Sequence, residues 1–218
     1  MPVGTRRTMP GVAGHPPTRD RERSRQRILD AAERLFAQHG FDRVTMADVG
    51  AAVGLSRGAP GYLFGSKLGL YEEVLARLFD AREAVLREPW SALGAAADEA
   101  LPAALKVAVR AYLEFLQSRP TFIAITEREA LAGAPHLGGA PRRSTSIEDA
   151  LTALAERRPF RISSALIVVL SVGMFPLVHR DTVLIPRGID PSEEAVLERH
   201  TVLVTDLALA VIEGRAGI

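Results

Sequence analysis

Hydrophobic residues recur at helical spacing along most of the chain. In residues 24–39, "SRQRILDAAERLFAQH", the apolar positions fall on one face of a helix, and Gly40 ends the run. Comparable patterns cover residues 46–53, 55–64, 67–87, 101–118, 120–132, 144–157, 162–179 and 191–213. Pro89 is expected to end the fourth helix, and the "DPSEE" of residues 190–194 is expected to open the last one. Because alternation of the strand type is missing over any useful length, the pattern predicts an all-α fold.

Residues 45–67, "TMADVGAAVGLSRGAPGYLFGSK", contain two of the shortest predicted helices. Thr45 is placed to cap the first of them, with Asp48 three residues later in the position of a capping-box acid. Gly50 suits a close approach of two helices, Gly54 suits the tight turn between them, and Leu55 suits the space beneath that turn. This spacing predicts a helix-turn-helix, a unit that lays its second helix in the major groove of DNA.

Composition limits the class of protein. The chain has 218 residues, of which 47% are hydrophobic and 24% charged, and it has no cysteine. These values are typical of a globular protein, and the lack of cysteine excludes disulfides and thiolate metal sites. The first 20 residues lack the apolar centre of a secretory signal, and the most apolar stretch, residues 165–178, is shorter than the ~20 residues that span a bilayer. We therefore expect a cytoplasmic location with no membrane partner.

Charge is distributed unevenly between the two ends. Residues 1–67 contain 11 lysines and arginines against 6 acidic residues, whereas residues 68–218 contain 16 against 20. The amino-terminal end is therefore the candidate for contact with a polyanion. We expect a disordered basic arm over residues 1–20, a helix-turn-helix domain over 21–66 and a larger helical domain over 67–218. The arginines near the start of the first helix (Arg19, Arg21, Arg23 and Arg25) either meet phosphates and the adjacent minor groove or belong to a solvated tail.

A family resemblance rests on residues 24–79. The segments "ILDAAERLFAQHGF", "VGAAVGLS" and "FGSK", together with the Thr45 cap, resemble the DNA-binding domain of TetR-family transcriptional regulators. The resemblance implies a homodimer whose three amino-terminal helices bind a roughly palindromic operator in double-stranded DNA. It also implies a helical carboxyl-terminal domain that dimerises and binds a small-molecule effector. Most members of the family repress transcription, and the effector releases them from DNA.

The same resemblance assigns residues to the DNA interface. It implies a phosphate contact for Thr45, a position at the start of the recognition helix for Arg57 and Gly58, and phosphate contacts for Tyr62 and Lys67. Tyr62 could instead be a half-buried packing ring, and Lys67 an ordinary solvated lysine. The expected DNA-binding set is Thr45, Ser56, Arg57, Gly58, Ala59, Gly61, Tyr62 and Lys67.

The recognition helix departs from the family pattern at Ala59, Pro60 and Gly61. Proline lacks an N–H and disfavours a helical conformation in the residue before it, so we expect the helix to start late or to be distorted. Alanine and glycine offer almost no polar side chain to the bases. The sequence therefore predicts few base contacts, with DNA shape carrying part of the specificity.

Two residue sets follow for the carboxyl-terminal domain. Ligand pockets are mostly apolar and aromatic with a few polar groups. The candidates for an effector pocket are Tyr112, Phe115, Leu116, Phe122, Ile125, Thr126, Glu129, Met174 and Phe175, and each could equally be ordinary core. The last two long helices are more apolar than one solvent-facing helix requires, which predicts a dimer interface. Its candidates are Ala165, Val168, Val169, Val172, Val202, Leu203, Leu207, Leu209 and Ala210.

Other classes of function fit less well. The five histidines are scattered, and Glu127 and Glu129, two positions apart, point to different faces of a helix. No phosphate loop or nucleophile elbow occurs, so we expect neither an enzyme nor a bound metal or cofactor. Two alternatives remain open from the sequence: an architectural protein that binds DNA non-specifically without an effector, and a regulator controlled by a protein partner.

Overall fold

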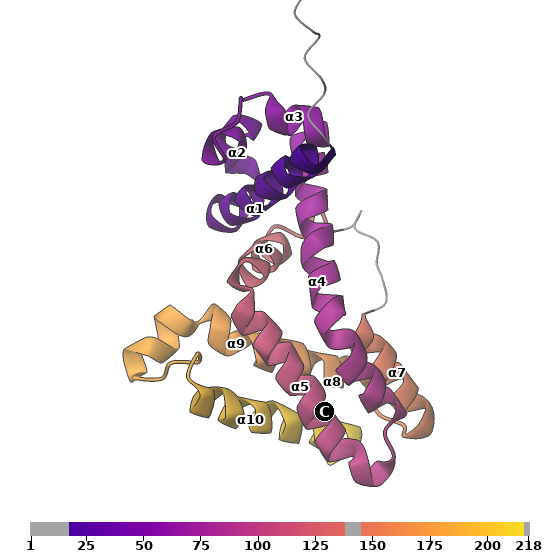
Figure 1. Ribbon diagram of the computed structural model, residues 1–218. Helices are drawn as coiled ribbons and strands as arrows, with labels where there is room; N and C mark the ends of the chain where they lie inside the picture. The colour runs from indigo at the N-terminus through magenta and orange to yellow at the C-terminus, as the bar shows by residue number, and fades with distance from the viewer. Residues whose placement is uncertain (1–17, 138–144, 216–218) are drawn as a thin grey trace, which may run out of the picture.

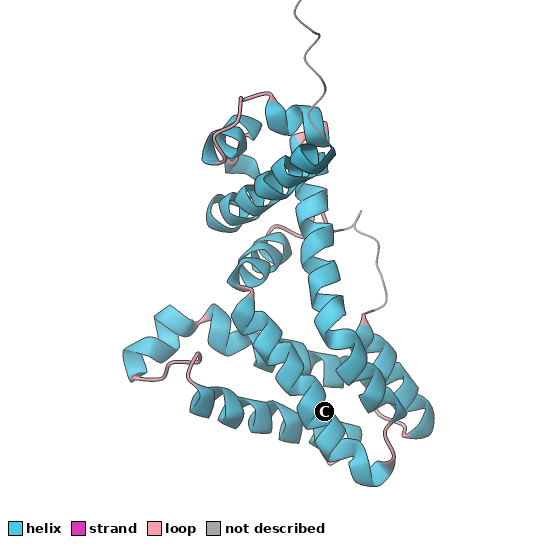
Figure 2. Cartoon of the chain, viewed as in Figure 1, coloured by secondary structure: helices cyan, strands magenta, loops and turns pink. Residues whose placement is uncertain are grey.

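The computed structural model describes residues 18–137 and 145–215. Its described residues form helices and connecting turns and contain no strand (Figure 2). The predicted all-α fold is therefore confirmed.

Three helices form one end of the molecule: α1 (Thr18–Arg43), α2 (Met46–Ala52) and α3 (Ala59–Phe64) (Figure 1). Gly40 has a φ of 78° and interrupts α1 where the sequence predicted its end. At the other end of α1, the helix begins at Thr18, earlier than the apolar pattern indicated, because its first turns are polar and add no periodic apolar residue.

A single long helix, α4 (Lys67–Ala95), runs from this three-helix end into the rest of the molecule (Figure 1). The prediction that Pro89 ends it is wrong. Leu86, Trp90 and Leu93 are fully buried at helical spacing on both sides of the proline, so the core holds the last turns in place. The carbonyl that loses its helical donor belongs to Val85, which is 48% exposed.

The remaining helices form a larger body, in which α5 (Leu101–Ser118) and α7 (Ser146–Arg157) pack against α4. The helices of this body are η1 (Asp98–Ala100), α5, α6 (Pro120–Leu131), α7, α8 (Ile162–Ile167), η2 (Val168–Val172), α9 (Gly173–Val178), η3 (Arg180–Leu184), η4 (Ile185–Arg187) and α10 (Glu194–Ile212). Figure 1 shows α6 between α1 and this larger helical body. The last helix starts at Glu194, because Asp190 accepts hydrogen bonds from the backbone and side chain of Ser192 and forms a turn there.

The run predicted as one helix over residues 162–179 is divided by a π-helical turn, η2. Pro176 lies inside α9 and cannot donate to the carbonyl of Val172 four residues earlier. Nε2 of His200 on α10 lies 2.9 Å from that carbonyl oxygen and donates to it. A histidine side chain thus replaces the missing backbone donor and ties α10 to the broken run.

Within residues 18–137 and 145–215, no single helix is both long enough and apolar enough to cross a membrane. One bent pair, Ile162–Val178 with Arg180–Arg187, meets the length and composition criteria together.

Candidate functional site

The start of α2 is held by a complete capping box. The Thr45 hydroxyl accepts from the backbone N–H of Asp48 at 3.1 Å, and the Asp48 carboxylate accepts from the Thr45 backbone at 2.9 Å. The hydroxyl also donates to that carboxylate at 2.7 Å. These bonds with Thr45 hold the pKa of Asp48 below its usual value. The hydroxyl proton of Thr45 is therefore engaged, and a phosphate would have to compete with Asp48 for it.

The turn between α2 and α3 depends on two glycines. A Cβ atom at Gly50 would stand 2.9 Å from the carbonyl oxygen of Ser56, so no side chain fits there. Gly54 has a φ of 68°, in the left-handed region that favours glycine. Leu55 donates its N–H to the Gly50 carbonyl at 2.9 Å, which closes the turn.

Pro60 does not distort α3. It occupies the first turn of the helix, where a backbone N–H would have no helical partner. The N–H of Tyr62 donates to Gly58 at 3.0 Å and that of Gly65 to Gly61 at 2.9 Å, so the ladder is regular after the proline. The expected distortion is wrong, although the helix does start only at Ala59, after Arg57 and Gly58.

The outer side of α3 combines exposed side chains with open space. Tyr62 is 76% exposed, which excludes the half-buried packing ring, and Arg57 and Ser56 are exposed as well. A Cβ atom at Gly58 or Gly61 would meet nothing within 4 Å. Unlike Gly50, these two glycines are not required by packing within the protomer.

Lys67 is held in place at the first residue of α4. Its Nζ donates to the carbonyl of Asp42 at 3.1 Å and lies 4.3 Å from the ring centroid of Phe41. A cation at the amino-terminal end of a helix opposes the helix dipole and gains nothing from it. This fixed ammonium is therefore not an ordinary solvated lysine, and its position suits an anion.

Arginines of α1 border this surface. The guanidinium of Arg21 lies 5.6 Å from the ring centroid of the exposed Tyr62, so the first turns of α1 reach α3. Arg27 donates to the carbonyl of Val53 at 2.6 Å, and Arg25 pairs with Glu73. Arg23 is exposed, and the side chain of Arg19 lies outside the described part of the structure. The sequence showed only that these residues are basic. The contact between Arg21 and Tyr62 could not be predicted because the two residues are 41 positions apart.

The geometry agrees with comparisons to known proteins. Residues 28–74 match the family model described as bacterial regulatory proteins, tetR family. These residues therefore carry a TetR-type DNA-binding domain. The chain is similar to the HTH-type transcriptional repressor AcnR of Corynebacterium glutamicum, with 43% identity over 60 residues, which is 28% of this chain and 30% of AcnR. It is also similar to the HTH-type transcriptional regulator TtgR of Pseudomonas putida, with 33% identity over 66 residues, which is 30% of this chain and 31% of TtgR.

Similarity to a solved structure of a TetR-family member extends over the whole fold. A TetR family transcription regulator from Marinobacter aquaeolei superposes with a TM-score of 0.68 at 16% identity, covering 87% of this chain and 98% of that one. The chain spans about 30% of the length of the curated relatives that it matches. These similar proteins are transcriptional regulators and not enzymes. The family model covers residues 28–74, whereas the likeness to the solved structure, at 16% identity, shows the fold alone.

The residues expected to form an effector pocket are mostly packed against one another. Phe122 makes edge-on ring contacts with Phe115 at 5.2 Å and with Phe79 at 5.6 Å. Buried in the core are Tyr112, Phe115, Leu116, Phe122, Ile125 and Glu129. Thr126 and Met174 are partly buried, and Phe175 is 50% exposed. The aromatic cluster therefore fills its own space, and of the nine residues Leu116 lines a cavity described below.

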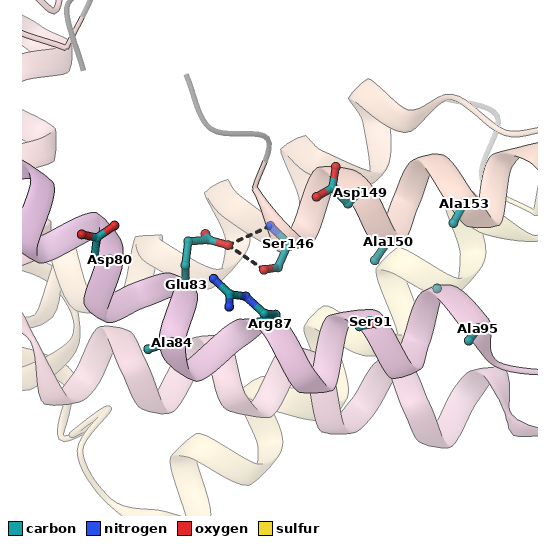
Figure 3. Close-up of a pocket in the computed structure, with 11 residues that line it drawn as sticks. Asp80, Glu83, Ala84, Arg87, Ser91, Ala95, Ser146, Asp149, Ala150 and Ala153 are labelled. Carbon is teal, nitrogen blue, oxygen red and sulfur yellow. Dashed lines mark hydrogen bonds between the residues drawn. The ribbon is translucent and has the colours of Figure 1, made fainter. Parts of the chain in front are cut away.

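Two cavities open on the larger domain. One, of about 840 Å³, lies between α4 and α7, where Glu83 accepts from the backbone and hydroxyl of Ser146 at 3.0 and 2.6 Å (Figure 3). The other, of about 470 Å³, lies where α5, α6 and α9 meet, and Leu116 is on its wall. No group of three or more histidine or acidic side chains in the described residues could hold a metal ion.

The predicted dimer residues divide into two groups. Ala165, Val168, Val169 and Leu209 lie in the core of the protomer, and Val172 and Ala210 are partly buried. Val202, Leu203 and Leu207 are exposed on α10 at helical spacing. The exposed apolar residues of the neighbouring run are instead Ile167, Leu170, Phe175 and Val178, also at helical spacing. We refer to these seven exposed side chains of α8, η2, α9 and α10 as the apolar stripe; α10 packs beside α8 and η2.

A buried carboxylate joins α6 to the start of α4, beside the three-helix end. Glu129 of α6 is 4% exposed and accepts from the Tyr71 hydroxyl of α4 at 2.9 Å and from the His136 backbone at 3.1 Å. Nδ1 of His136 also lies 2.9 Å from it. Burial alone would raise the pKa of Glu129, but the hydrogen bonds from His136 and Tyr71 outweigh it and hold that pKa below the usual value.

The residue before Glu129 strengthens this connection. Arg128 donates to the carbonyls of Ala37 and Gln38 at 3.2 and 3.1 Å, at the end of the regular part of α1. Further along the same contact, Thr121 donates to Glu33 of α1 at 2.6 Å. Helix α6 is thereby fastened to the three-helix end at several points.

Proposed function

We propose that this protein is a homodimeric transcriptional repressor of the cytoplasm that binds a palindromic operator in double-stranded DNA and is released by a small, mostly apolar effector. The observation that carries the proposal is the outer side of α3 and of the turn before it, which has exposed Arg57 and Tyr62 and two glycines with open space around them. Such a face lets a backbone come close to DNA while few side chains extend from it.

The expected roles follow from these positions. Arg57 is the exposed side chain with two parallel donors suited to a guanine edge, whereas Tyr62 and Lys67 are suited to phosphates. Gly58 and Gly61 leave room for the sugar-phosphate backbone or the base edges. Thr45, Ser56 and Ala59 stay in the proposed interface, Thr45 with its hydroxyl shared with Asp48.

Dimerisation is supported by the apolar stripe. Ile167 is 64% exposed and Leu203 51%, on neighbouring runs that each repeat such residues at helical spacing. Exposed apolar side chains that gather on neighbouring helices mark a candidate interaction site. Two copies that face each other across a two-fold axis would bury both stripes, and that symmetry requires an operator with two inverted half-sites.

The proposed release by an effector uses α6. This helix contributes to the cavity at α5, α6 and α9, and its other side is bonded to α1 and α4 through Arg128 and Glu129. A ligand that shifts α6 therefore changes the position of the DNA-binding end, provided that it binds the two arrangements with different affinity.

The decisive experiment is a selection of random duplex DNA on the purified protein at moderate salt. Recovery of an inverted repeat, bound by two protomers, is the expected result. Recovery of unselected sequence, with binding that disappears as salt rises, would support the non-specific architectural protein instead.

Three substitutions test the residue roles on the recovered operator. Lys67→Ala and Tyr62→Ala should weaken binding to all sequences, and Lys67→Ala should lower the slope of log K against log salt by about 1. Arg57→Ala should also relax the base preference. The matched control is Lys106→Ala, at the only other lysine of the chain, which pairs with Glu198 on α10 at 2.6 Å. Unchanged affinity in all three variants would show that the interface is elsewhere.

A further inference from the structure

The cavity at the junction of α5, α6 and α9 has a composition that selects a class of ligand. Its volume of about 470 Å³ is within the range of small-molecule sites. Apolar side chains form most of its wall: Leu116, Pro120, Ile123, Ala124, Leu177 and Val178. Its polar lining residues are Gln117, Glu127, Arg180 and Ser192.

Three of these four polar side chains are already satisfied by the protein. Gln117 donates to the carbonyl of Pro191 at 2.5 Å, and the Ser192 hydroxyl donates to Asp190 at 2.7 Å. The guanidinium of Arg180 pairs with Asp190 at 3.2 Å and with Asp181 at 2.9 Å. The one positive charge on the wall is thus compensated twice, which disfavours an anionic ligand.

Glu127 differs from the other three. In the described part of the chain its carboxylate has no hydrogen bond and no ion pair, and it stands one helical turn from Ile123 on α6. A negative charge without a partner among the described residues therefore lies beside an apolar wall.

We infer that this cavity is the effector site and that it takes a small organic monocation, an apolar or aromatic body with one ammonium group that pairs with Glu127. This inference rests on the proposed function, which supposes an effector, and it specifies the chemical class of that effector. The apolar body covers Leu116, Ile123 and Leu177, and the ammonium group supplies the charge that Glu127 lacks. A carboxylate partly removed from water gains more from a cation than an exposed one does.

A matched pair of fluorescent probes tests this inference. Dansylcadaverine carries a primary ammonium at neutral pH, and N-pentyl dansylamide has the same body and chain without the charge. Binding of both to the full-length protein is measured by the rise in dansyl emission and by anisotropy. We expect the cation to bind at least tenfold more tightly than the neutral probe.

Variants distinguish this site from general adsorption. Glu127→Gln should remove the difference between the probes and leave the neutral probe within about twofold of its wild-type affinity. Ala124→Leu, which narrows the cavity, should weaken both probes. The matched control is Glu88→Gln, at an exposed acid of α4 outside the cavity lining, which should change neither affinity.

The same preparations are titrated with operator DNA, so that the two proposals fail separately. If the wild-type protein does not bind operator DNA, the proposed function is refuted, whichever probes bind. With DNA binding intact, the inference is overturned if neither probe binds, if both bind equally, or if Glu127→Gln affects both probes to the same extent.

Discussion

Replacing Gly61 with alanine should stabilise the protein and weaken its binding to DNA. Gly61 lies inside α3, and a Cβ atom there would meet nothing within 4 Å of the free protein. A glycine inside a helix costs about 0.5–1 kcal/mol relative to alanine, so Gly61→Ala should raise the free energy of unfolding by that amount. For a chain of this size the midpoint of thermal unfolding should rise by about 1–4 °C.

The DNA complex should respond in the opposite direction. If DNA fills the open space at Gly61, the added methyl group overpacks that contact at a cost of about 1–3 kcal/mol. This cost corresponds to a roughly 5- to 150-fold rise in the dissociation constant. The assays are urea and thermal unfolding at one fixed protomer concentration, because dimer stability depends on concentration, and anisotropy with labelled operator.

Gly50→Ala is the internal control. Its Cβ atom would stand 2.9 Å from the carbonyl oxygen of Ser56, so the variant should lose about 1–3 kcal/mol of stability before any DNA is added. The reasoning would be refuted if Gly61→Ala destabilised the free protein, or if it stabilised the protein and left DNA affinity unchanged.

Three further predictions concern the larger domain and its junction with the three-helix end. Leu203→Asp in the apolar stripe should shift the dimer towards monomers in sedimentation velocity, whereas Val107→Asp, at a residue 60% exposed on α5, should not; equal effects would argue against the stripe. Glu129→Gln should cost about 1–3 kcal/mol at neutral pH. Because folding lowers the pKa of Glu129, the carboxylate stabilises the protein fully above the usual value of 4.5, and this stabilisation is lost as the pH falls through the folded pKa. In urea titrations the difference in unfolding free energy between wild type and variant should therefore shrink below pH 4.5. A difference that does not change with pH would contradict the assignment. His200→Ala should cost about 1–3 kcal/mol of stability because it leaves the Val172 carbonyl without a donor. The cost should be smaller in a Pro176→Ala background, which restores the backbone N–H. If the two costs are simply additive in this double-mutant cycle, the His200 side chain does not replace the missing backbone donor.

Local signals in the sequence were sufficient to predict the fold of the three-helix end. The Thr45 cap, Gly50 and Gly54 act within a few residues of one another, so their spacing predicts the turn that the structure contains. Pro60 was misjudged because the rule against proline in a helix does not apply to its first turn. Pro89 was misjudged for a different reason, since burial of Trp90 and Leu93 overrides the local preference.

Properties that depend on long-range packing could not be predicted in the same way. Helical spacing alone cannot decide which face of α8 and η2 turns outward, so Ala165 and Val169 were assigned to a surface although they lie in the core, and Ile167 was overlooked. The bond from His200 to Val172 joins residues 28 positions apart, and that from Tyr71 to Glu129 joins residues 58 apart. Neither pair leaves a periodic trace in the sequence.

The uninterrupted length of α4 has a mechanical consequence. Its 29 residues extend about 43 Å at the ~1.5 Å rise of an α-helix, with Lys67 at one end and Trp90 anchored near the other. A rigid rod with about 35 Å between Trp90 and Lys67 turns a tilt of about 5° at Trp90 into a displacement of about 3 Å at Lys67. That displacement is about the length of a hydrogen bond, so a small rearrangement in the core is enough to make or break a hydrogen bond at the Lys67 end.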